Sequence, residues 1–159
     1  MRVTISIAVC LLQIWMAQAQ TTGPAKGALV IVGGNDKAQL CFKEFLKLAG
    51  GTDAKIVIVT TASSSSKSFD YINHSQVKVA REILGLTNVM ALHTHDPAKA
   101  DTKEFIKPLL KADAVWFTGG RQWRLADAYL GTQTEKAFKE VLARGGVIGG
   151  SSAGATIQG

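Results

Sequence analysis

Cysteine is scarce in this 159-residue sequence, which contains only Cys10 and Cys41. Cys10 falls in an amino-terminal segment that we expect to be removed, leaving Cys41 as the single cysteine and excluding an intramolecular disulfide. Cys41 lies at helical spacing among Leu40, Phe42 and Phe45. This pattern favours a small core residue over a nucleophile.

Clusters of one charge sign are also missing. The net charge is +6, but the lysines and arginines are scattered along the chain without interleaved aromatic residues. A nucleic-acid-binding protein needs a basic patch or stripe, so the sequence argues against nucleic acid as a partner. We interpret the excess positive charge as a solvated surface.

Histidine is rare as well, with His74, His93 and His95 the three present. His93 and His95 would point to one face of a strand, as a pair of metal ligands would. No further ligand cluster accompanies them, so we expect no metal and no other cofactor, and solvent-exposed histidine side chains.

No apolar run is long enough to cross a bilayer, which takes about 20 residues. The apolar stretch at 5–16 follows Arg2, is interrupted by Gln13 and ends before Ala17-Gln18-Ala19. This order is typical of a secretory signal peptide cleaved after Ala19. We therefore expect a secreted or periplasmic protein without stable membrane association after cleavage, with a short leader at 20–26 before the domain at 27–159.

Beyond the leader, short apolar runs alternate with longer amphipathic segments. Strands that are apolar throughout and separated by helices indicate an α/β fold with a doubly wound, mostly parallel sheet. Glycines at 50 and 51 predict a helix end, and Pro108 predicts a kink or an early stop in its helix. The predicted strands are 28–32, 55–61, 88–93, 114–118 and 146–150, and the predicted helices 36–49, 69–84, 101–111, 123–129 and 134–144.

The residues from Gly150 to Gly154 match the pattern G-x-S-x-G, with Ser152 at its centre. An apolar strand runs directly into the motif and small residues follow it, which predicts a nucleophile elbow with a strained backbone at the serine. A Cβ atom at either glycine would collide with the tight turn. The alternative is a glycine-rich connection whose serine only caps the next helix.

Acyl transfer also needs hydrogen-bond donors for the oxyanion. The N–H of Ala153 follows the serine, and Gly119 and Gly120 come after the preceding strand, where glycine allows close approach of substrate. An ordinary tight turn at Gly119-Gly120 is the alternative. The serine run at 63–66 follows the second strand and could line the pocket, but we favour a flexible loop there.

Three segments carry a resemblance to a known family: VGGNDK at 32–37, FTGGRQ at 117–122 and GSSAGA at 150–155. In order and spacing they resemble the motifs of cyanophycinases, in the serine-peptidase family that includes dipeptidase E. The resemblance covers nearly all of 27–159 and implies a flavodoxin-like three-layer sandwich similar to class I glutamine amidotransferases.

The resemblance also implies roles for individual residues. Ser152 matches the nucleophile, Gly120 and Ala153 match the oxyanion positions, and Gln122 matches a glutamine beside the substrate pocket. We expect Gly119 to contact substrate together with Gln122. Position 121 is commonly acidic in cyanophycinases and is arginine here. The implied substrate is a peptide or a cyanophycin-like polymer cleaved at β-aspartyl-arginine linkages, or aspartyl dipeptides by similarity to dipeptidase E.

In this family the acid and the histidine of the catalytic set follow the nucleophile. Only 153–159 follow Ser152 in this sequence, so we expect an amino-terminal fragment that is inactive alone. Two other interpretations remain. One is an esterase of the α/β-hydrolase type, which is disfavoured because no His-Gly oxyanion motif follows an early strand. The other is a degenerate binding protein that retains the fold. The sequence leaves the oligomeric state open.

Overall fold

The computed structural model describes residues 23–35, 39–63 and 75–159. The predicted signal peptide, His74 and the serines at 64–66 lie outside these ranges. Within them, five parallel strands form one sheet in the order β1-β5-β4-β2-β3. The strands are β1 (Ala28–Val32), β2 (Ile56–Val59), β3 (Val89–Leu92), β4 (Ala114–Phe117) and β5 (Val147–Ser151).

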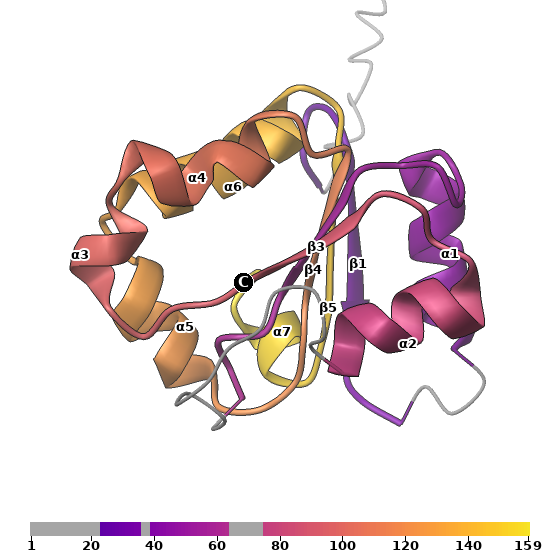
Figure 1. The fold of residues 1–159 in the computed structure, drawn as a ribbon, viewed down its shortest axis with the longest axis horizontal. Helices are drawn as coiled ribbons and strands as arrows, with labels where there is room; N and C mark the ends of the chain where they lie inside the picture. The colour runs from indigo at the N-terminus through magenta and orange to yellow at the C-terminus, as the bar shows by residue number, and fades with distance from the viewer. Residues whose placement is uncertain (1–22, 36–38, 64–74) are drawn as a thin grey trace, which may run out of the picture.

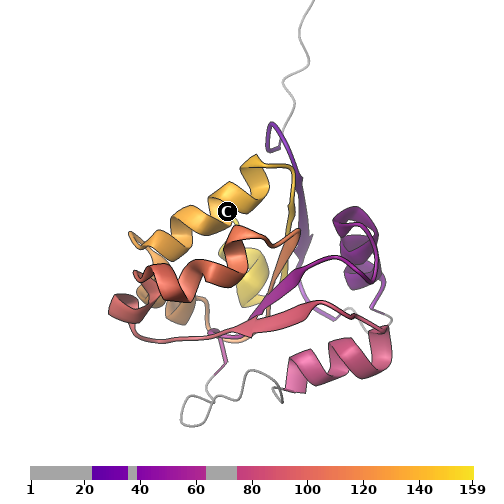
Figure 2. The ribbon, with the colours of Figure 1, turned by 45° about the horizontal axis from the view of Figure 1, so that its top comes forward.

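Helices cover both faces of this sheet (Figure 1). α1 (Leu40–Ala49) and α2 (Ser75–Leu84) lie on one face. The opposite face, clear in the tilted view of Figure 2, carries the other helices. They are α3 (Pro97–Ala100), α4 (Lys103–Leu110), α5 (Gln122–Tyr129), α6 (Gln133–Ala143) and α7 (Ala153–Thr156). The predicted doubly wound α/β architecture is confirmed.

The continuous apolar character of the central strands β2 and β4 follows from their burial on both faces. All four residues of β2 are buried, and successive side chains point to opposite faces of the sheet. Val57 and Val59 join the core beneath α4 to α7, whereas Ile56 and Ile58 join the core beneath α1 and α2. A strand exposed on one face would instead alternate apolar and polar residues.

Helix ends follow local capping chemistry. Gly50 ends α1 in the left-handed region at φ 105°, as predicted, and the Gly51 N–H donates to Leu46 O at 2.8 Å. The helix predicted at 101–111 is α4 alone, because the Thr102 side chain accepts from the Phe105 N–H and caps it there. Pro108 lies inside α4, which ends soon after it at Leu110.

The position of β5 places the candidate site in the middle of the molecule. β5 pairs with β1 on one side and β4 on the other, so the turns that follow these strands meet at one edge of the sheet. Gly149 in β5 allows Phe45 and Trp116 to pack closely, since a Cβ atom there would lie 2.7 Å from both rings.

None of the helices in the described ranges combines the length and apolarity that a membrane crossing requires.

Candidate active site

Ser152 occupies a sharp turn between a strand and a helix. It follows the last residue of β5, precedes α7 and has φ 54° and ψ −115°. A residue with a side chain pays an energetic penalty in this region, and such strain concentrates at functional sites. The turn is fixed from below by the Ser152 N–H, which donates to Val32 O of β1 at 2.9 Å. The strained backbone predicted at this serine is present.

The two glycines of the motif are required by backbone crowding. A Cβ atom at Gly150 would lie 2.5 Å from the carbonyl oxygen of Gly154. A Cβ atom at Gly154 would lie 2.1 Å from the carbonyl oxygen of Phe117 in β4. Both distances are well inside van der Waals contact, so the turn can pack against β4 only with glycine on each side of Ser152. This prediction from the sequence is confirmed.

The turn after β4 lies directly beside Ser152. A Cβ atom at Gly119 would be 3.4 Å from the Ser152 Cβ and 3.9 Å from its Oγ. Gly120 has φ 143° and passes so close to the loop after β2 that a Cβ atom would be 2.2 Å from Ala62 O. The Arg121 N–H donates to that same oxygen at 2.9 Å and fixes the turn.

Two backbone amides near Ser152 are available as donors. Among the residues that the structure describes, neither the Gly120 N–H nor the Ala153 N–H has an acceptor. The Ser152 side chain is exposed, whereas Ala153 is buried beneath it at the start of α7. Gln122 is exposed as the first residue of α5. The structure therefore gathers the predicted residues at one edge of the sheet, and their catalytic roles stay predictions.

A cleft of about 400 Å³ opens beside Ser152 on the face of the sheet covered by α1 and α2. Its floor is apolar, and polar side chains from Asn35 and Gln39 join Ser151 and Ser152 in its wall. Asn35 and Gln39 both have left-handed backbones, at φ 60° and 53°. The remaining lining residues are Gly34, Phe42, Ile58, Val79, Ala80, Leu84 and Trp116.

The two described histidines lie away from Ser152. Nδ1 of His93 is 3.0 Å from the Thr60 hydroxyl, and Nε2 of His95 is 2.9 Å from Thr61 O, so both rings are held by the segment after β2. Both residues follow β3, which is three strand spacings from β5, about 14 Å. Neither reaches Ser152 as a general base. The expectation of solvent exposure is wrong for His93, which is 6% exposed and lies against Thr60, just after β2.

Comparison with known proteins identifies the family. The model of peptidase family S51 matches residues 29–159. The chain belongs to peptidase family S51. It is 31% identical over 134 residues to a cyanophycinase of Geminocystis herdmanii, covering 82% of this chain and 48% of that protein. A cyanophycinase of Synechococcus elongatus is 28% identical over 138 residues, covering 84% and 42%. The S51 chain thus spans about half the length of the curated relatives it matches.

Solved structures agree with this S51 membership. A peptidase from an acI-B1 actinobacterium superposes with a TM-score of 0.66 at 25% identity, covering 82% of this chain and 55% of that one. A peptidase E protein of Listeria monocytogenes EGD-e shares the fold, with a TM-score of 0.52 at 24% identity, covering 82% and 60%. The predicted cyanophycinase and dipeptidase E family is confirmed.

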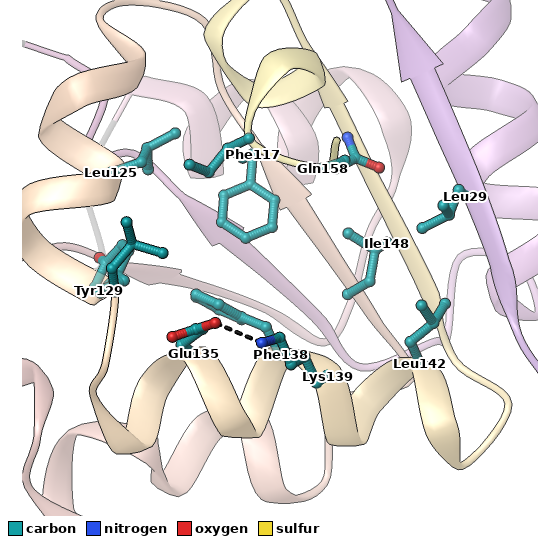
Figure 3. Close-up of a pocket in the computed structure, with 12 residues that line it drawn as sticks. Leu29, Phe117, Leu125, Tyr129, Glu135, Phe138, Lys139, Leu142, Ile148 and Gln158 are labelled. Carbon is teal, nitrogen blue, oxygen red and sulfur yellow. Dashed lines mark hydrogen bonds and ion pairs between the residues drawn. The ribbon is translucent and has the colours of Figure 1, made fainter. Parts of the chain in front are cut away.

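A second cavity of the S51 chain, of about 220 Å³, lies across the sheet from the cleft and does not include Ser152 (Figure 3). Its wall is apolar apart from Gln158 and the Glu135–Lys139 ion pair. The bond from Lys139, with a second from the Gly131 N–H, lowers the pKa of Glu135. The apolar lining comes from Leu29, Phe117, Leu125, Tyr129, Leu130, Phe138, Leu142, Ile148 and Ile157.

Sequence reasoning missed part of the cleft and was right about Cys41. Asn35 belongs to the VGGNDK segment that resembles the family motif, but no motif pointed to Gln39 or Trp116.

Cys41 is half-buried against the core beneath α1 and α2, as a structural residue would be. Ser63 is half-buried and its N–H donates to Thr60 O at 2.9 Å.

Proposed function

We propose that this S51 chain carries the nucleophile and the oxyanion-binding amides of a serine peptidase. The observation that carries the proposal is the strained, exposed Ser152 between β5 and α7, beside two amides that have no acceptor among the described residues. A nucleophile elbow holds its serine in this manner, with the hydroxyl presented at the top of the sheet. The esterase reading loses support from family membership.

In the proposed reaction, Ser152 Oγ attacks the carbonyl carbon of the scissile bond and its proton passes to a general base. The N–H groups of Ala153 and Gly120 donate to the tetrahedral oxyanion, and loss of one such donor costs about 2.7–4 kcal/mol in known enzymes. Collapse of this intermediate releases the protonated amine and leaves an acyl-serine, which water hydrolyses. Because His93 and His95 lie too far away, we place the base outside the described residues.

The proposed substrate is a peptide or isopeptide bond of an aspartyl residue, with β-aspartyl-arginine linkages of a cyanophycin-like polymer as the first candidate. Two S51 relatives that are cyanophycinases support this choice. We further propose that the protein is exported and cleaved after Ala19, on the strength of the signal-peptide pattern alone.

Release of dipeptides from a β-aspartyl-arginine polymer tests the proposal. Ser152→Ala should lower kcat by a factor on the order of 10⁶, since nucleophile, base and oxyanion donors act as a unit. Ser151→Ala is the matched control, because Ser151 is the half-buried neighbour in β5 and has no assigned chemical step. It should keep the rate within about tenfold of the parent.

Equal rates for Ser152→Ala and the parent protein would show that the nucleophile is misassigned. Binding of the polymer without release of dipeptides would instead favour a binding protein that has kept the fold.

A further inference from the structure

The backbone of Arg121 lies at the edge of the candidate site. Gly119 is in contact distance of Ser152, and the Cα of Arg121 is two residues further, at most about 7 Å from that of Gly119. Arg121 is exposed and precedes α5 as its cap residue. Its long side chain can therefore reach a group one residue away from a carbonyl seated at Ser152.

The guanidinium of Arg121 has an aromatic partner but no counter-ion within the part of the chain that the structure describes. It lies 5.2 Å from the centre of the Trp123 ring, which is itself 51% exposed. No carboxylate among the described residues forms an ion pair with it. Stacking on an aromatic face orients the guanidinium plane and leaves its N–H donors directed outward.

A second guanidinium adds to this positive charge. Nη1 of Arg124 donates to Ala62 O at 3.1 Å, the same oxygen that accepts from the Arg121 N–H. Arg124 likewise makes no ion pair within the described ranges. By contrast, four of the eight lysines in the described helices pair with a glutamate one turn away: Lys47, Lys78, Lys107 and Lys139.

We propose that Arg121 recognises a carboxylate of the substrate, so that the site prefers substrates with an anionic group next to the scissile bond. This inference rests on the proposed function only in placing the substrate at Ser152. A guanidinium binds a carboxylate through two parallel N–H···O bonds that are strengthened by the opposite charges. A carboxamide has one oxygen acceptor and no charge, so it binds the guanidinium more weakly. Arg121, stacked on Trp123 and without an ion pair among the described residues, offers that fork within reach of Ser152.

Binding measurements on the Ser152→Ala protein test this preference without any dependence on turnover. The ligands are the β-aspartyl-arginine dipeptide and its two monoamides, in which one carboxylate or the other is a carboxamide. Calorimetric titration should show at least one monoamide binding about 10- to 100-fold more weakly than the dipeptide, the range for a charge-assisted hydrogen bond. Adding Arg121→Gln should reduce that difference to less than about threefold.

Two further variants sharpen the result. Arg121→Lys keeps the charge but not the fork, and should retain only part of the discrimination. Lys103→Gln removes an exposed charge at the start of α4 and should leave the discrimination unchanged. Thermal melting of each variant should match the parent, since Arg121 and Lys103 are both exposed.

The proposal is overturned if the dipeptide and both monoamides bind equally, if the dipeptide does not bind at millimolar concentration, or if the discrimination survives Arg121→Gln. Failure of the proposed function has a different signature. In that case the parent protein would not cleave the polymer, while the carboxylate preference and its loss in Arg121→Gln would persist.

Discussion

An alanine at position 154 would force the turn after Ser152 away from the sheet. Its Cβ would lie 2.1 Å from the carbonyl oxygen of Phe117 and 2.7 Å from the Phe117 Cβ. Phe117 ends β4, which is paired on both sides, so the obstacle is central backbone rather than a flexible side chain. Overpacking typically costs about 1–3 kcal/mol, and we expect about 3 kcal/mol at this position.

Urea unfolding followed by tryptophan fluorescence would measure this cost, since Trp116 is buried in the core. With a slope of about 2 kcal/mol/M, a loss of 3 kcal/mol lowers the midpoint by about 1.5 M. Gly33→Ala is the matched control, because Gly33 has open space around its Cα and no left-handed backbone. It should be neutral, or stabilising by less than about 1 kcal/mol. Equal midpoints for Gly154→Ala and Gly33→Ala would refute the crowding argument.

Further predictions concern the neighbouring turn, a helix cap, pH and processing. Gly120→Ala should destabilise the fold by at least about 1 kcal/mol in the same assay, because its Cβ would lie 2.2 Å from Ala62 O. Thr132→Ala should cost about 0.5–2 kcal/mol, since the Thr132 hydroxyl caps α6. Because the pKa of Glu135 is lower in the folded protein, its ionised carboxylate stabilises the fold at pH values above the unfolded pKa, and this stabilisation is lost as the pH falls through the folded pKa. Glu135→Gln should therefore lower the melting temperature at pH 7 and have no such effect in acid, as thermal melts at both pH values would show. Mass spectrometry of exported protein should find Gln20 at the amino terminus, and a retained Met1 would exclude cleavage.

The features predictable from the sequence are those that local chemistry determines. Five apolar runs marked the strands: β2 and β4 are buried on both faces, and β1 stays apolar although Leu29 and Ile31 are exposed on one of its faces. Gly150 and Gly154 were assigned to a crowded turn because a strand and small residues flank Ser152. The short helix α3 was missed, and the helix predicted from 101 begins at Lys103 because one hydroxyl, that of Thr102, caps it there.

The features that could not be predicted depend on strand order. The cleft joins Asn35 after β1 to Ser151 in β5, and these strands are neighbours although β1 is the first and β5 the last of the described strands. The burial of His93 depends on Thr60, which follows the neighbouring strand β2 and is 33 positions away in the sequence. Periodicity shows which face a residue occupies, but not which strand lies beside it.

Covalent labelling of the full-length protein by a fluorophosphonate, mapped by mass spectrometry, tests the central claim most directly. Such a probe captures a serine only when its hydroxyl is activated and an oxyanion site receives the phosphoryl oxygen. We predict one adduct, on Ser152, that is absent in Ser152→Ala and kept in Ser151→Ala. An adduct on another serine, or none under conditions where the polymer is cleaved, would contradict the assignment of Ser152 as the nucleophile.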